Sequence, residues 1–141
     1  MARHFLEMFR YACTLEFADI IAHPLVVYPR TFDYGCINLL SDKELTEAIG
    51  LAGENHIAME ISPKSLMREQ IDFRMRFYRL CKQVGVRFSI GSDAHSLSNV
   101  GNVHVLAPVV RELEVTDDDI WLPRKVTNGQ KALGHYDGGA A

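Results

Sequence analysis

Cysteine is scarce in this sequence and poorly placed for cross-links. The three cysteines, Cys13, Cys36 and Cys81, are odd in number, widely spaced, and form no Cys-x-x-Cys pair. This distribution argues against a disulfide framework and against a structural zinc knuckle. We therefore expect all three thiols to be buried and reduced.

The sequence also lacks long hydrophobic runs and a strong charge of either sign. No apolar stretch approaches the roughly 18 residues of a membrane span, and the opening residues 1–5 lack the apolar core of a signal peptide. The formal net charge of -3 gives no general attraction to nucleic acid or to anionic membranes. We expect a cytoplasmic protein, with neither a membrane nor nucleic acid as its partner.

What remains is the composition of a globular domain. The 141 residues are 48% hydrophobic and 23% charged, enough for one domain with a real core but short for a complete eight-fold barrel. Glycine, asparagine and alanine dominate after Thr127, so we expect residues 126–141 to be a disordered tail. The cationic side chains of residues 68–82 are interrupted by acids and predict a solvated helix face.

Hydrophobic spacing predicts helices over residues 3–14, 41–53, 65–84 and 106–113, and Thr116 with the three aspartates that follow it predicts another helix start. The second has the firmest start, because Ser41 and Glu44 have the spacing of a capping box. Three short apolar runs between these helices, residues 17–22, 56–61 and 86–90, predict buried strands. Alternation of strand and helix predicts an α/β fold with parallel βα repeats.

Polar side chains follow each predicted strand where it ends. His23 follows the first strand, Glu60 lies near the end of the second, and Asp93 and His95 follow the third. The carboxyl ends of parallel strands open on one face, which is where such folds build their sites. Imidazole and carboxylate are ligands that suit zinc, manganese or iron, so a metal site is favoured over satisfied core polar groups.

The segments around these residues resemble the later motifs of the PHP (polymerase and histidinol phosphatase) domain. They are Ala18-Asp19-Ile20-Ile21-Ala22-His23-Pro24, Ala58-Met59-Glu60-Ile61-Ser62, Ile90-Gly91-Ser92-Asp93-Ala94-His95 and Val100-Gly101. The resemblance implies that residues 1–125 form part of a distorted (βα)7 TIM-like barrel. It also implies a hydrolase in which metal-activated water attacks a phosphate ester, with a phosphorylated small molecule or a phosphodiester as substrate.

Residue roles follow from the same resemblance. His23, Asp93 and His95 match metal ligands, and Glu60 and Asp93 would serve catalysis, with Glu60 orienting a ligand or water. The chain departs from the family pattern in lacking its first motif, a pair of histidines, and the middle Glu and His. It therefore resembles only the carboxyl-terminal half of a PHP domain.

Half a barrel would expose sheet edges and apolar faces. We therefore expect a homo-oligomer, or a partner chain that completes the barrel. A second hypothesis follows, in which the chain is a catalytically silent metal-binding half-barrel that acts in assembly. A third, an amidohydrolase-like barrel fragment, fits the contexts of His23 and Asp93 less well.

Three further residues are weaker candidates for contacting a substrate phosphate. Arg30 lies in the loop after His23, although a loop arginine is more often merely solvated. Ser96 and Asn99 precede an expected helix start, where exposed backbone amides favour anions.

Overall fold

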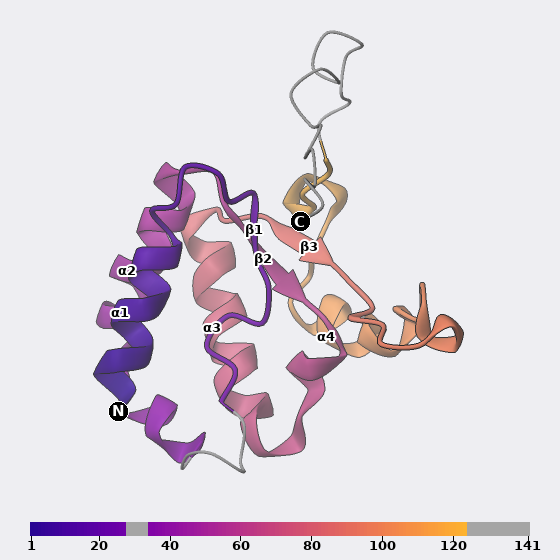
Figure 1. Ribbon diagram of the computed structural model, residues 1–141, viewed down its shortest axis with the longest axis horizontal. Coiled ribbons are helices and arrows are strands. Elements are labelled where there is room, and N and C mark those ends of the chain that lie inside the picture. Colours follow the sequence, from indigo (N-terminus) through magenta and orange to yellow (C-terminus); the bar gives the residue numbers. More distant parts are fainter. Residues whose placement is uncertain (28–33, 124–141) are drawn as a thin grey trace, which may run out of the picture.

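The computed structural model describes residues 1–27 and 34–123, in which three long helices pack together beside a small parallel sheet (Figure 1). The helices are α1 (Ala2–Ala12), α2 (Asp42–Glu54), α3 (Ile71–Val84) and α4 (Ala107–Glu112), and the strands are β1 (Ile20–Ile21), β2 (Ala58–Ile61) and β3 (Phe88–Ile90). Short 3-10 helices fill the connections: η1 (Tyr34–Leu39), η2 (Pro63–Leu66), η3 (Arg68–Gln70), η4 (Leu97–Asn99), η5 (His104–Leu106) and η6 (Asp117–Asp119).

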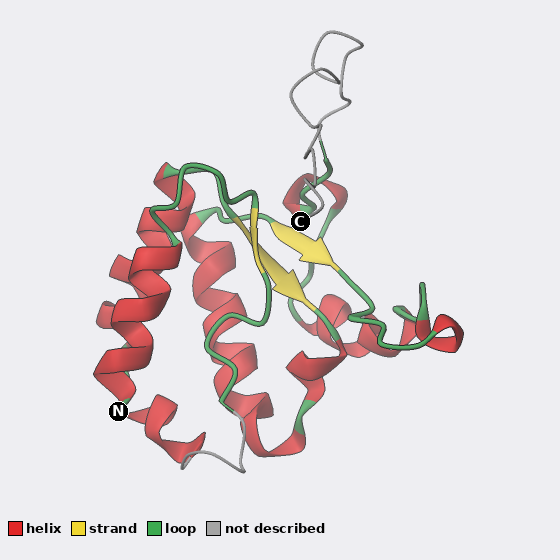
Figure 2. Cartoon of the chain, viewed as in Figure 1, coloured by secondary structure: helices red, strands yellow, loops and turns green. Residues whose placement is uncertain are grey.

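The sheet has the order β1-β2-β3, and both strand pairs are parallel (Figure 2). Ile20 pairs with Ala58 across the first interface, and Met59 pairs with Phe88 across the second. Helix α2 connects β1 to β2, and α3 connects β2 to β3. The prediction of an α/β fold with parallel βα repeats is confirmed.

Local sequence signals set the ends of α2 and α3. Ser41 accepts a hydrogen bond from the Glu44 amide at 3.3 Å, and Glu44 accepts one from the Ser41 amide at 2.9 Å, which completes the predicted capping box. Gly85 ends α3 with φ 83°, a left-handed conformation in which a Cβ atom would be strained.

The core lies between the helices and the sheet. Tyr78 of α3 packs edge to face on Phe77 and on Phe88 of β3, with ring centroids 5.6 and 5.9 Å apart. The expected free thiols are confirmed, since Cys13, Cys36 and Cys81 are buried and unpaired. Burial raises the pKa of Cys13 to about 12, so its thiol stays protonated at neutral pH.

The first strand is much shorter than predicted. Only Ile20 and Ile21 pair with β2, and the Phe17 side chain at the start of the predicted strand is 85% exposed. The first interstrand bond runs from the Ala58 amide to the Asp19 carbonyl at 2.9 Å. Residues before Asp19 lie beyond the amino end of β2 and have no residue of β2 to pair with. Their hydrophobicity alone therefore does not extend the strand.

The helix predicted over residues 65–84 is also divided. Two 3-10 turns, η2 and η3, precede α3, which begins at Ile71. Arg74 was expected on a solvated face, but it is 1% exposed. The predicted tail, residues 126–141, and the loop residues 28–33 lie outside the described part of the chain.

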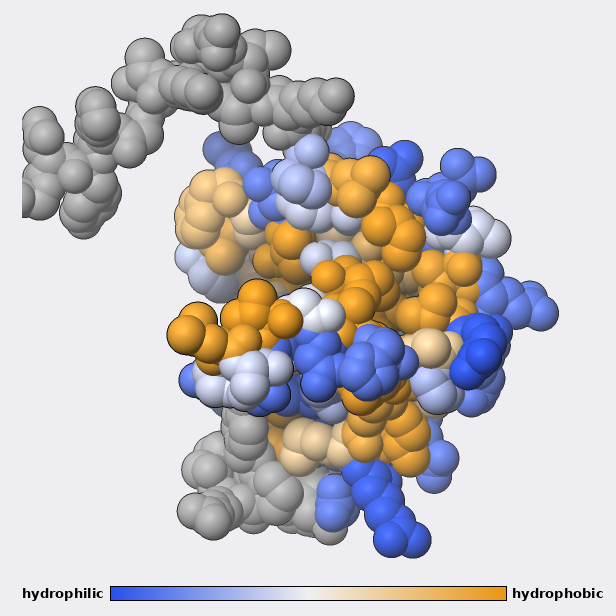
Figure 3. Space-filling view, turned by 90° about the vertical axis from the view of Figure 1, so that its right-hand side faces the viewer, coloured by the Kyte–Doolittle hydropathy of each residue, from blue (hydrophilic) through white to orange (hydrophobic). Residues whose placement is uncertain are grey.

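A contact that the sequence did not indicate extends the sheet beyond β3. Ile120 forms a parallel bridge with Phe88, and the Trp121 amide donates to the Phe88 carbonyl at 2.8 Å. Figure 3 shows the side of the molecule that lies to the right in Figure 1, where hydrophobic side chains gather between polar ones. Within residues 1–27 and 34–123, no helix has the length and hydrophobicity needed to cross a bilayer.

Candidate functional site

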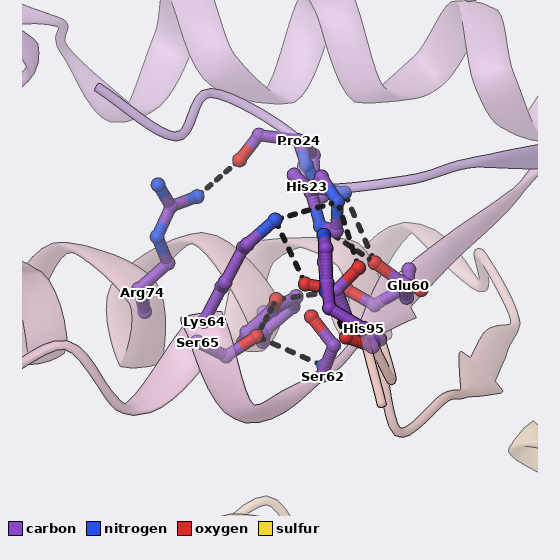
Figure 4. Close-up of polar contacts among 10 residues, drawn as sticks. His23, Pro24, Glu60, Ser62, Lys64, Ser65, Arg74 and His95 are labelled. Atoms are coloured by element: carbon purple, nitrogen blue, oxygen red, sulfur yellow. Dashed lines mark hydrogen bonds and ion pairs between the residues drawn. The ribbon is translucent and has the colours of Figure 1, made fainter. Parts of the chain in front are cut away.

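The three strands bring His23, Glu60 and Asp93 together at their carboxyl ends, where His23 contacts both carboxylates. Figure 4 shows His23 beside Glu60. Glu60 is the third residue of β2, while His23 and Asp93 follow the ends of β1 and β3. Their side chains are partly exposed: 26% for His23, 14% for Glu60 and 18% for Asp93. The parallel arrangement inferred from the sequence thus brings these three side chains together.

A tight turn at residues 23–25 aims the His23 side chain at the sheet edge. His23 and Leu25 have φ of 49° and 55°, which non-glycine residues adopt infrequently. The buried guanidinium of Arg74 donates to the carbonyls of Pro24 and Leu25, the latter at 2.8 Å, and to Oε1 of Gln70 at 2.9 Å. Arg74 therefore holds the turn in place from inside the core.

The Arg74 guanidinium remains charged despite its burial. Burial lowers the pKa of Arg74 to about 10, and its partners are carbonyl oxygens of the turn and the Gln70 amide. These acceptors compensate part of the cost of removing the charge from water. A buried cation in the core thus stabilises the turn that carries His23.

Glu60 contacts both the backbone and the ring of His23. Oε2 accepts from the His23 amide at 3.2 Å and lies 2.9 Å from ring Nδ1. Nδ1 is buried and has no hydrogen-bond partner of acceptable geometry, so the short contact with Glu60 is not an aligned hydrogen bond.

The other ring nitrogen of His23, Nε2, faces Asp93 and Lys64. This nitrogen lies 3.4 Å from Oδ1 of Asp93 and 3.3 Å from Nζ of Lys64. Nζ also lies 2.8 Å from Oδ2 of Asp93. The hydrogen bond from Lys64 is the main cause that lowers the pKa of the Asp93 carboxyl, with smaller contributions from His23 and His95.

Lys64 was not among the residues singled out from the sequence. It lies in η2, directly after β2, and its side chain is 25% exposed. The available signal was its position three residues beyond the end of that strand, behind Pro63, on the edge that collects the other polar groups. A lysine there looks like an ordinary solvated loop residue until the fold places it against Asp93.

A chain of hydrogen bonds supports the end of β2 beneath the site. The Ser62 amide donates to Oγ of Ser65 at 3.2 Å, the Ser65 hydroxyl lies 2.6 Å from that of Tyr78, and Tyr78 donates to the Glu60 carbonyl at 2.9 Å. Ser65 and Tyr78 are buried. This series of hydrogen bonds fixes the backbone from which the Glu60 side chain projects.

His95 is not brought into the cluster. Its side chain is exposed, and its Nδ1 lies 2.7 Å from the carbonyl oxygen of Asp93, a contact within its own loop. In the part of the chain that the structure describes, no group of three or more His, Cys, Asp or Glu side chains is arranged to hold a metal ion. The predicted set of His23, Asp93 and His95 is therefore not assembled.

The pair formed by His23 and Asp93 nevertheless has the geometry of two ligands. Two atoms each about 2.1 Å from a tetrahedral ion lie about 3.4 Å apart, and Nε2 of His23 and Oδ1 of Asp93 are 3.4 Å apart. Glu60 beside the opposite ring nitrogen is the usual outer partner of a ligating histidine. Lys64 lies against Nε2 of His23 and against Oδ2, the other carboxylate oxygen of Asp93.

The weaker substrate candidates are not gathered at the cluster. Ser96 and Asn99 are exposed, and Ser96 contacts the neighbouring Ser98 hydroxyl at 3.0 Å. The element that follows Ser96 is the short η4, which ends at Asn99, whereas α4 begins only at Ala107. Arg30 lies outside the described residues.

The arrangement places the His23 imidazole between two carboxylates, of which Asp93 also pairs with the Lys64 ammonium. Comparison with protein-family models, with curated proteins and with solved structures found no match to this chain.

Proposed function

We propose that this protein is a divalent-metal-dependent hydrolase that acts on phosphate esters. The observation that carries the proposal is His23, whose Nδ1 faces Glu60 while its Nε2 lies at ligand spacing from Asp93. An imidazole oriented by a carboxylate and paired with a second carboxylate is typical of zinc and manganese sites. The resemblance to the PHP domain supports phosphate esters as the substrate class.

Each side chain has a distinct part in this proposal. His23 Nε2 and Asp93 would hold the ion, and His95 would join them by turning its exposed ring. Glu60 would keep the proton on Nδ1 and so keep the Nε2 lone pair available. The ion would supply Lewis acidity that polarises a phosphoryl oxygen and lowers the pKa of a water molecule.

Hydrolysis of p-nitrophenyl phosphate in the presence of Mn²⁺ tests the proposal. Asp93→Asn should abolish activity, because the amide keeps the shape of the side chain but loses its charge. Asparagine also tolerates the left-handed backbone of this residue, whose φ is 49°. Asp72→Asn on α3 is the matched control and should retain activity; equal activity in the two variants would contradict the proposal.

The proposal extends to the wider architecture. A sheet of three parallel strands with its site at the carboxyl edge is compatible with a segment of a distorted (βα)7 barrel, as the PHP resemblance implies. In that arrangement a second copy of the chain, or another chain, would supply the remaining strands. Size-exclusion chromatography with light scattering should then report a mass above that of one chain.

A second candidate function is a silent metal-binding module that acts in assembly. Large apolar side chains on the surface favour it: Phe17 is 85% exposed, Leu97 94% and Leu122 74%. Exposed groups of this size are typical of surfaces that meet a partner. Metal binding and oligomerisation without hydrolysis of any phosphate ester would favour this module over the enzyme.

A further inference from the structure

A cavity of about 440 Å³ lies at the amino ends of β2 and β3, at the opposite end of the sheet from His23 and Asp93. In Figure 1 this is the end at the tails of the two strand arrows, where α2 and α3 end. The lining includes Ile57 and Val86, whose side chains are only 2% and 4% exposed. The size and the apolar lining are those of a cavity that holds a small molecule.

Two similar turns form one wall of the cavity. His56 after α2 and Gly85 after α3 both have a left-handed backbone, with φ of 57° and 83°, and the next amides, of Ile57 and Val86, bond back to their helices at 2.9 and 3.0 Å. Glycine is the usual residue at such a position because it has no Cβ atom. His56 occupies it despite the steric cost, and its side chain lines the cavity.

The opposite wall comes from the segment after η6. The Trp121 amide donates to the Phe88 carbonyl at 2.8 Å, which fixes Trp121 beside β3. Its half-buried side chain lines the cavity together with Leu122. An indole ring offers a large flat surface on which another aromatic ring can pack.

Arg87 gives the cavity its charge. Its carbonyl accepts from the Met59 amide at 3.0 Å, so the sheet fixes its backbone. Within residues 1–27 and 34–123 its exposed side chain has neither an ion pair nor a hydrogen bond, and none of the described residues that line the cavity is acidic. The guanidinium is therefore available to an anion, and its planar fork matches the two oxygens of a carboxylate.

We propose that this cavity binds a small planar aromatic carboxylate, whose ring packs against Trp121 and whose carboxylate pairs with Arg87. Arg87 is the only residue with a permanent charge among the described residues of the lining. A monoanion is thus neutralised, whereas a dianion such as a phosphate monoester would bring a second negative charge that Arg87 does not balance. This binding site is separate from the proposed catalytic site and independent of its metal chemistry.

The test is titration of ¹⁵N-labelled protein with 2-naphthoate, followed by NMR. Trp121 is the single tryptophan of the chain, so its indole N–H gives one signal that reports directly on the cavity. We expect a saturable shift of that signal. The uncharged analogue 2-naphthamide should bind at least about tenfold more weakly, because it cannot form the charge-assisted pair with Arg87.

Arg87→Met should weaken 2-naphthoate binding by about tenfold or more and leave 2-naphthamide binding unchanged. Arg111→Met is the matched control, since Arg111 is an exposed arginine on α4 that does not line the cavity. It should bind 2-naphthoate as wild type does.

His56→Gly separates the function of the side chain from its effect on stability. Glycine adopts the left-handed backbone without strain, so the midpoint of urea denaturation should stay equal or rise. Loss of the ring should weaken 2-naphthoate binding by about threefold or more. Glu114→Gly, at a left-handed residue with φ 51° outside the cavity, should gain the same stability and keep the affinity.

Three results would overturn the proposal. The first is the absence of a saturable shift of the Trp121 signal with 2-naphthoate up to about 1 mM. The second is equal affinity for 2-naphthoate in wild type and Arg87→Met, which would remove the role of the guanidinium. The third is tighter binding of 2-naphthyl phosphate or of cyclohexanecarboxylate than of 2-naphthoate, which would contradict the aromatic carboxylate as the ligand class.

Discussion

Oε2 of Glu60 lies 3.2 Å from the backbone nitrogen and 2.9 Å from ring Nδ1 of His23. One carboxylate oxygen of β2 thus contacts two nitrogen atoms of a histidine that follows the neighbouring strand, β1. Glu60 thus holds the His23 ring close to the His23 backbone, and Nε2 of the ring points toward Asp93 and Lys64. The chemistry proposed for the site depends on this orientation of the ring.

Gly91→Ala should disturb that orientation with little loss of stability. A Cβ atom at residue 91 would lie 2.9 Å from Oε1 of Glu60, too close to be tolerated, but the obstructed atom is the end of a flexible side chain. The carboxylate would move, and His23 would lose its partner. We expect metal affinity to fall by roughly 10- to 100-fold, as measured by Mn²⁺ titration.

Gly50→Ala is the control for this variant. Gly50 lies inside α2, and a Cβ atom there meets nothing within 4 Å. The substitution should stabilise the protein by about 0.5–1 kcal/mol and leave metal affinity unchanged. An affinity for Mn²⁺ in Gly91→Ala equal to that of wild type would contradict the role given to Glu60.

Arg74→Met should destabilise the protein and loosen the turn at His23. The change removes the donors to the carbonyls of Pro24 and Leu25 and leaves these buried acceptors without the guanidinium. We expect a loss of about 2–4 kcal/mol in the free energy of unfolding, measured by urea denaturation. Arg79→Met, at an exposed residue of the same helix, should cost less than about 1 kcal/mol.

Tyr78→Phe tests the support beneath β2. The hydroxyl of Tyr78 donates to the Glu60 carbonyl and contacts Ser65, while the ring packs in the core. Phenylalanine keeps the ring and leaves both buried polar groups without this partner, at an expected cost of about 1–2 kcal/mol in urea denaturation. Unchanged stability would show that the hydrogen-bond chain does not hold the strand end.

The capping box at η6 predicts a pH dependence of stability. Hydrogen bonds from Thr116, followed by Lys82, lower the pKa of the Asp119 carboxyl from its ordinary value of 3.8. The folded state therefore favours the carboxylate, and its contribution is fully present above that value and lost as the pH falls through the lower folded value. The contribution should be at most about 1 kcal/mol, because the side chain faces solvent.

Asp119→Asn should remove this contribution. In urea denaturation the variant should be less stable than wild type at neutral pH, and the two should converge as the pH falls below the ordinary range of an aspartate. Asp118→Asn, an exposed neighbour outside the capping box, is the control. A difference between wild type and Asp119→Asn that grows toward low pH would contradict the assignment.

Local signals in the sequence were sufficient for the elements they control. Ser41 and Glu44 form the predicted capping box, which begins α2. The convergence of His23, Glu60 and Asp93 was also predictable, because it follows from strand order alone. Each of these outcomes depends on neighbours in sequence or on a general property of parallel sheets.

Features set by distant contacts could not be anticipated in the same way. Phe17 was predicted to lie in a strand, but β2 has no residue that could pair with the residues before Asp19. Arg74 was predicted to be solvated, but it is buried and donates hydrogen bonds to the carbonyls of residues 24 and 25, about 50 residues earlier in the chain. Lys64 and the bridge of Ile120 to Phe88 likewise depend on three-dimensional packing.

The proposed metal site is tested most directly by the amount of Zn²⁺ or Mn²⁺ bound per chain, measured by elemental analysis with the mass in solution determined in the same run. We expect about one equivalent or more in wild type and loss of metal in both His23→Asn and Asp93→Asn. In both variants asparagine tolerates the left-handed backbone found at these residues. His104→Asn, at an exposed histidine outside the cluster, should bind as wild type does. A protein that holds no metal after incubation with both ions would contradict the central claim.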